Sequence, residues 1–126
     1  MSAPTSEPAT AAIACVEAFT AAFNARDVLG MDALLHFPHV ILADENLIIW
    51  TAPGQLSPTY FDELAAAGWG ASTYHDKQVV LAGDRKVHLL LDYSRDRPDG
   101  TQISRHHNLW IVTWQDGRWG IKQRSY

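Results

Sequence analysis

Strong turn signals divide the C-terminal half of the chain into long apolar segments, and this pattern constrains the fold more than any other feature. The signals are Gly83-Asp84, Pro98-Asp99-Gly100 and Asp116-Gly117. The segments between them, roughly 72–82, 86–96, 102–114 and 118–125, are rich in Val, Ile, Leu and Trp. Because such glycine-containing turns favour tight hairpins, the pattern predicts a four-stranded antiparallel meander.

Helical periodicity precedes this meander. Over residues 8–25, apolar side chains recur at three- and four-residue spacing, which predicts an amphipathic helix; they are Ile13, Val16, Phe19 and Phe23. A second, short helix is predicted after Asp27, a good N-cap, with Met31, Leu34 and Leu35 on one face. Pro38 is expected to end that helix.

The middle of the chain predicts a hairpin and a third helix. Residues 39–43 and 47–51 are apolar and flank Asp44-Glu45-Asn46, and Ser57-Pro58 is typical of a helix start. The order helix, helix, hairpin, helix, meander predicts an α+β fold, with three N-terminal helices packed on a curved, mostly antiparallel sheet. We expect a flexible N-terminal tail over residues 1–8 and a single domain over residues 9–126.

Composition narrows the class of protein. The 126 residues are 47% hydrophobic and 19% charged with a net charge of −4, which suits a globular domain and argues against a nucleic-acid partner. No apolar stretch is long enough to span a membrane, and the first ten residues do not resemble a signal peptide, so we expect a cytoplasmic protein. The lone Cys15 lies in an apolar helical pattern and is interpreted as a core residue.

Strand alternation predicts which side chains face the helices. A two-residue Asp116-Gly117 turn pairs Trp114 with Trp119, Val112 with Ile121 and Trp110 with Gln123. The inner face then ends in polar groups, His106, Asn108 and Gln123, as a ligand pocket requires.

The neighbouring strands extend this inner face. A Gly83-Asp84 turn pairs Asp76 with Leu91, and the apolar alternation from Val87 to Tyr93 predicts that Tyr74, Asp76 and Tyr93 face inward. If residues 97–100 form the next loop, Leu91 lies beside His106, so that Asp76, Leu91 and His106 share one row. Asp76 and His106 would lie about 10 Å apart, on either side of a small ligand. A bulge in either of the later turns would instead present Arg105, His107 and Leu109.

Two local stretches resemble the NTF2-like superfamily, which includes SnoaL-like cyclases and ketosteroid isomerase. They are "FTAAFNARDVLGMDALL", with its Asn24-Ala-x-Asp27 junction, and "VTWQDGRWGIKQRSY" near the C-terminus. The resemblance implies a cone-shaped fold around a small-molecule pocket and frequent dimerisation through the sheet. The resemblance does not imply the isomerase chemistry. The tyrosine that stabilises the oxyanion in the isomerase corresponds to Phe19 here, which has no hydroxyl. The isomerase's base aspartate corresponds to a position near Ala43, with Asp44 one residue away, and its second oxyanion donor to a position near residues 108–110.

Several histidines and acidic residues are candidate catalytic or metal-binding groups. Asp44, Asp76 and His106 are the candidate acid–base groups, and the alternatives are a solvated aspartate and an ordinary pocket histidine. His36 and His39 lack a nearby third ligand, which favours packing over a metal site. Strand register places His75 beside Asp92, as in a catalytic His–Asp dyad, but both are expected on the outer face of the sheet.

These patterns predict a small-molecule-binding domain with no metal and no cofactor. The expected ligand is a small hydrophobic molecule, bound by Phe19, Phe23, Tyr74, Tyr93, Asn108, Trp110 and Gln123. One hypothesis is a metal-free lyase, isomerase or cyclase acting on a hydrophobic carbonyl compound; the alternatives are a non-catalytic binding protein and a protein-interaction module. An outer face with Leu109 and Ile111 beside Lys122 and Arg124 predicts a homodimer.

Overall fold

The computed structural model of the chain describes residues 7–126, and these contain three helices and six strands. The elements are α1 (Pro8–Asn24), α2 (Val28–Ala33), β1 (Leu35–Ala43), β2 (Asn46–Trp50), α3 (Tyr60–Ala66), β3 (Ala71–Ala82), β4 (Lys86–Asp96), β5 (Gln102–Gln115) and β6 (Arg118–Ser125). Most of the N-terminal tail predicted over residues 1–8 lies outside the described residues. Glu7 and Pro8 are the N-cap and first residue of α1.

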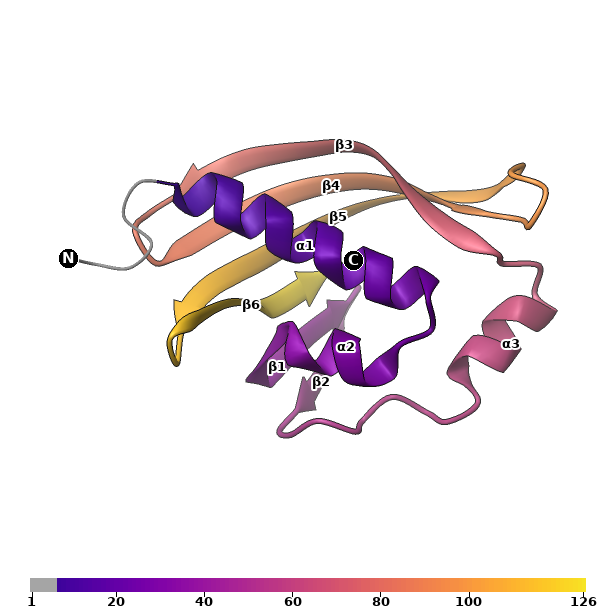
Figure 1. The fold of residues 1–126 in the computed structure, drawn as a ribbon, viewed down its shortest axis with the longest axis horizontal. Coiled ribbons are helices and arrows are strands. Elements are labelled where there is room, and N and C mark those ends of the chain that lie inside the picture. Colours follow the sequence, from indigo (N-terminus) through magenta and orange to yellow (C-terminus); the bar gives the residue numbers. More distant parts are fainter. Residues whose placement is uncertain (1–6) are drawn as a thin grey trace.

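The six strands form one sheet in the order β2-β1-β6-β5-β4-β3. All neighbouring strands are antiparallel except β1 and β6, which are parallel. Figure 1 shows the long strands β3, β4 and β5 curving around α1, which lies across the concave side of the sheet, while α3 lies beyond one end of the sheet. The predicted α+β architecture of helices on a curved, mostly antiparallel sheet is confirmed.

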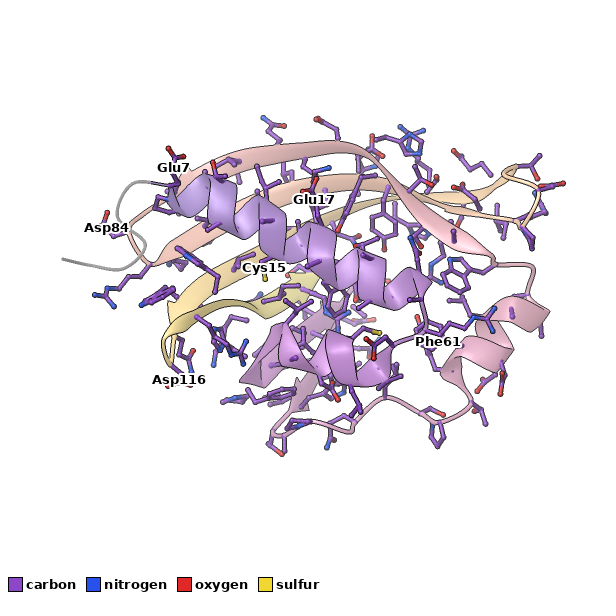
Figure 2. The ribbon with its side chains drawn as sticks, in the orientation of Figure 1. Glu7, Cys15, Glu17, Phe61, Asp84 and Asp116 are labelled. Carbon is purple, nitrogen blue, oxygen red and sulfur yellow. The ribbon has the colours of Figure 1, made fainter. Side chains whose placement is uncertain are left out.

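The core lies between α1 and the concave face. Ala12, Val16 and Phe19 form the buried stripe of α1, and they meet an inner sheet face that includes Val87, Leu89, Val112 and Ile121. Each large side chain buried here contributes roughly 1.5–3 kcal/mol to folding. Cys15 belongs to the buried side of α1 (Figure 2), and burial raises the pKa of its thiol to about 11, as suits a core residue. Among the described residues, no helix is both long and apolar enough to cross a membrane.

The segment after α2 departs from the prediction. The helix ends at Ala33, and Pro38 lies within strand β1 instead of ending a helix. Proline is tolerated there because it falls where the β1–β6 register shifts, between Leu35 and Val40, and before β1 begins to pair with β2 at His39.

Two bulges in β3 correct the predicted direction of Asp76. The β3–β4 hairpin pairs Ala82 with Val87, and His75 and Val80 are extra residues in the ladder. Tyr74 therefore returns to the predicted partner, Tyr93, and faces inward. Asp76 pairs with Asp92 and is exposed on the outer face, so its predicted inward position is wrong.

A third bulge, in β6, exchanges the sheet faces on which Gln123 and Arg124 lie. The turn at Asp116 and Gly117, both with positive φ, gives the predicted Trp114–Trp119 and Val112–Ile121 pairs. Lys122 is then an extra residue, so Trp110 pairs with Arg124 and not with Gln123. Two expectations are wrong as a result: Gln123 faces outward beside Ile111, and Arg124, expected on the outer face, points toward the helices.

Candidate ligand pocket

A pocket opens between α1, α3 and the concave face of β3 to β6. Its wall consists of Phe19, Thr20, Phe23, Tyr60, Ser72, Tyr74, Tyr93, Arg95, Trp110, Arg124 and Tyr126. The centre of a water-sized sphere can reach about 50 Å³, and the empty space including the open mouth is about 450 Å³. The smaller volume corresponds to about three to five water molecules, so a single-ring compound has to occupy part of the open mouth as well.

Aromatic rings form most of the wall. Five of the seven residues predicted to bind a ligand line the pocket: Phe19, Phe23, Tyr74, Tyr93 and Trp110. Phe19 meets Trp110 edge-to-face at 5.6 Å between centroids. On the α3 side, Phe23 packs against Phe61, which Figure 2 labels near the C-terminal end of α1, at 5.0 Å. Contacts between rings on separate elements therefore hold the wall in place.

Asn108 supports the wall without lining it. Its side chain is buried and its Nδ2 donates a hydrogen bond to the Tyr93 hydroxyl at 3.0 Å. The Tyr93 oxygen therefore acts as an acceptor toward Asn108, and its own proton is free to be donated. Burial raises the pKa of Tyr93, so the phenol is neutral at physiological pH.

The opposite side of the pocket holds a second set of hydroxyls. Tyr74 donates to the Val16 carbonyl at 3.2 Å and lies 2.7 Å from the Thr20 hydroxyl. Burial raises the pKa of Tyr74 strongly. Both hydrogen-bond contacts of the Tyr74 hydroxyl are with α1, and they fix the helix over the sheet. The Tyr93 hydroxyl, in contrast, still has a proton to donate.

The bulge in β6 places a buried arginine in the pocket wall. Arg124 is only 6% exposed, and its Nε donates to Nε2 of His39 at 2.9 Å. His39 Nδ1 donates in turn to the Ile121 carbonyl at 3.0 Å, so the imidazole is neutral. Burial first, and then the Arg124 charge, lower the pKa of His39 to about 3.

Aromatic faces surround the Arg124 guanidinium. Its Cζ lies 5.2, 5.5 and 5.9 Å from the ring centroids of Phe19, Trp50 and Trp110. Such cation–π contacts offset part of the cost of burying a positive charge. Within residues 7–126, no carboxylate lies within 4.0 Å of Arg124.

Further nitrogen donors in the wall lack acceptors. The buried Arg95 Nε and Trp110 Nε1 have no hydrogen-bond partner among the described residues. Arg95 makes one long contact from Nη2 to the Tyr60 hydroxyl, at 3.4 Å. Buried polar atoms are nearly always satisfied in folded proteins, so two unpaired donors on residues of one cavity wall are an unusual feature of this site.

The predicted acid–base residues do not converge on this pocket. Asp44 is exposed in the β1–β2 turn with φ 51°, and Asp76 is exposed on the outer face. His106 faces inward as predicted but stacks on Tyr93, 5.1 Å between centroids, behind the lining residues. Its Nε2 lies 2.8 Å from the Ser104 hydroxyl, and burial followed by the charge of Arg95 lowers its pKa.

The remaining histidine candidates are held by protein groups. His36 Nε2 lies 3.2 Å from the carbonyls of both Thr113 and Arg118, while His39 bonds as described above. Across residues 7–126, no group of three or more His, Cys, Asp or Glu side chains is placed to hold a metal ion.

The outer face carries polar networks but no dyad of His75 with Asp92. Arg105 donates to both oxygens of Asp92, which lowers the carboxyl pKa, and the Oδ2 atom also lies 3.5 Å from His107 Nε2. His75 instead contacts Ser94, whose hydroxyl donates to a neighbouring aspartate. His75 is therefore linked through Ser94 to Asp96 and not to Asp92.

Sequence reasoning missed six lining residues: Thr20, Tyr60, Ser72, Arg95, Arg124 and Tyr126. Arg95 lies two residues from Tyr93 on the same strand, so strand alternation alone was sufficient to find it. Arg124 was hidden because the bulge at Lys122 reverses the face on which it lies.

Comparison with solved structures identifies the class of fold. The chain superimposes with a TM-score of 0.69 on an NTF2-like protein with a cystatin-like fold from Novosphingobium aromaticivorans, at 12% identity over 94% of this chain and 80% of that one. A protein of unknown function with a cystatin-like fold from Nostoc punctiforme gives 0.69 at 11% identity, covering 96% and 90%. A ketosteroid isomerase-like protein from Erwinia carotovora atroseptica gives 0.63 at 16% identity, covering 95% of each chain.

The chain therefore has the NTF2-like, or cystatin-like, fold that the sequence resemblance predicted. No protein-family model matches the sequence, and no curated protein matches it significantly. At these identities the likeness establishes the fold, and function has to be argued from the pocket.

Proposed function

We propose that this protein binds a small molecule with a single apolar ring in the pocket beneath α1. The observation that carries the proposal is the cavity itself, which is walled by aromatic rings and, together with its open mouth, has room for a single ring. Small-molecule sites in proteins are typically apolar concavities with a few fixed polar groups, and Tyr93 and Arg124 supply such groups here.

The lining favours binding over acid–base catalysis. Among the described lining residues there is no aspartate, glutamate or histidine, and these are the usual general bases near neutral pH. A metal-free acid–base reaction on a hydrophobic carbonyl compound is the second candidate. It is supported by the Tyr93 hydroxyl, whose proton is free to be donated into the pocket.

One fluorine NMR experiment tests binding. We expect 4-fluoroacetophenone, a single-ring carbonyl compound, to bind with a dissociation constant on the order of 1 mM, as its few heavy atoms allow. Thr20→Phe fills the pocket and is expected to weaken binding at least about tenfold. Thr10→Phe, the same change at an exposed position of α1, is the matched control. Unchanged affinity in the Thr20 variant, with both variants folded, would contradict the proposed site.

The same sample separates a binding protein from an enzyme. In D2O, a protein that abstracts a proton next to the carbonyl exchanges the methyl protons of the ketone for deuterium. A binding protein leaves the exchange at the rate of buffer alone. Exchange that the protein accelerates and that Tyr93→Phe abolishes would favour the acid–base reaction.

We further propose that two copies associate through the outer sheet face, and that the protein acts in the cytoplasm. Strand register aligns Leu90 and Leu109 with Ser125 and Leu42 in one row of that face, and Ile111 with Gln123 and Val40 in the next row. Leu90 is 44% exposed, and a sheet face with apolar side chains on either side of a polar strand favours association. Light scattering should give twice the chain mass of 14.0 kDa, and Leu90→Lys should halve the measured mass. A monomeric wild-type protein would contradict this proposal.

A further inference from the structure

We infer that the pocket selects a ligand whose ring carries a carboxylate, and that the Arg124 guanidinium binds this group with help from Arg95 and Trp110. The inference rests on the proposed binding function and adds a chemical class to it. The ligand class is a small aryl carboxylate of the size of benzoate.

The first argument is the uncompensated charge of Arg124. Its side chain is almost fully buried, yet within residues 7–126 no carboxylate accompanies it. Only Nε has a hydrogen-bond partner among these residues, so both terminal amino groups keep their protons available at the pocket wall. Buried charges in proteins are normally paired, and a bound anion provides the missing partner.

The second argument is that His39 orients this arginine without neutralising it. The imidazole is fixed on the Ile121 carbonyl through Nδ1 and accepts the Arg124 Nε–H through Nε2. The contact holds the guanidinium plane and directs its other edge away from His39. A planar guanidinium with a free edge matches the two oxygens of a carboxylate.

The third argument is that the other unsatisfied atoms are hydrogen-bond donors and not acceptors. The unpaired atoms of two lining residues, Arg95 Nε and Trp110 Nε1, are both donors, and the Tyr93 hydroxyl also has a proton to donate. A pocket with these donors and no carboxylate side chain among its described lining residues favours a ligand rich in acceptors. The protein has a net charge of −4, so the preference for an anion is a local property of the pocket.

The aromatic wall adds the requirement for a ring. Phe19 and Trp110 form an edge-to-face corner directly below the Arg124 guanidinium, since both rings lie within 6 Å of its Cζ. A ligand ring seated at this corner makes aromatic contacts while its carboxylate reaches the arginine. The small enclosed volume, about 50 Å³, favours a ligand of no more than one ring.

The test compares two probes of nearly equal shape, 4-fluorobenzoate and 4-fluoroacetophenone, by fluorine NMR titration at pH 7.5. We expect the carboxylate to bind about 10- to 100-fold more tightly than the ketone, the usual range for charge-assisted hydrogen bonds to a buried group. Arg124→Gln should reduce the ratio of the two affinities to near one, and Arg95→Gln should reduce it partly. Arg85→Gln, which removes an exposed arginine outside the pocket, should leave the ratio unchanged.

The outcomes separate this inference from the proposed function. If the ketone binds in the pocket and the carboxylate binds no more tightly, the carboxylate preference is overturned while the binding function stands. If neither probe binds, the proposed function itself is overturned. If the ratio of carboxylate to ketone affinity is unchanged in Arg124→Gln, the assignment of the carboxylate site to Arg124 is overturned. Should that variant fail to fold, the wild-type ratio and the Arg95→Gln ratio decide between the same outcomes.

Discussion

The buried His39 should link the stability of the fold to pH in a way that can be calculated. In the folded protein its pKa is lowered to about 3, from the ordinary 6.5, because burial disfavours the imidazolium. In the unfolded chain the His39 imidazole therefore becomes protonated near pH 6.5, whereas in the folded protein it stays neutral down to about pH 3. The stabilisation is complete above pH 6.5 and is lost progressively as the pH falls.

The magnitude follows from the pKa difference. Each unit of pKa difference is worth about 1.4 kcal/mol, so lowering the pH from 7.5 to 5.0 should remove about 2 kcal/mol of stability through His39. The carboxyls with lowered pKa values, Asp92, Asp96 and Asp99, lose their contribution only near and below pH 4. The window between pH 5.0 and 7.5 therefore reports on histidines.

Urea unfolding at the two pH values provides the assay. Other histidines with lowered pKa values act in the same direction, so the wild-type protein should lose at least about 2 kcal/mol. His39→Gln keeps an acceptor oxygen for Arg124 but cannot titrate, and its loss over the window should be smaller by about 2 kcal/mol. Equal losses in the two proteins would refute the neutral, buried His39 on which the orientation of Arg124 depends.

Two further substitutions test local packing around the pocket. Asn24→Ala removes two side-chain hydrogen bonds, of 2.8 and 3.0 Å, that tie the end of α1 to the backbone at the start of β3, and unfolding should become easier by about 2 kcal/mol; a loss below about 0.5 kcal/mol would argue against them. Gly120→Ala would place a Cβ 2.7 Å from the His36 ring, so its melting temperature should fall well below that of Gly83→Ala, where the nearest atom is 3.7 Å away. Equal melting temperatures would mean that β6 is less tightly held than described.

The fold was predictable because its signals are local. The Asp116-Gly117 turn sets the β5–β6 hairpin, and the apolar spacing of α1 sets its buried face, so neither depends on distant residues. The inner positions of Phe19, Tyr93 and Trp110 followed from the same signals.

The polar half of the site was not predictable in the same way. A single extra residue, Lys122, moves Arg124 from the outer face to the pocket and Gln123 in the reverse direction. A bulge depends on how two strands fit together, and no residue type in β6 marks it in advance. Asp76 was misplaced for the same reason, since His75 is the extra residue in β3.

A crystal structure of the protein soaked with 4-bromobenzoate would test the central claim most directly. The account predicts an anomalous bromine signal inside the pocket beneath α1, with the carboxylate oxygens within hydrogen-bond distance of the Arg124 terminal nitrogens. Bromine bound only on the outer sheet face, or a carboxylate directed away from Arg124, would contradict it.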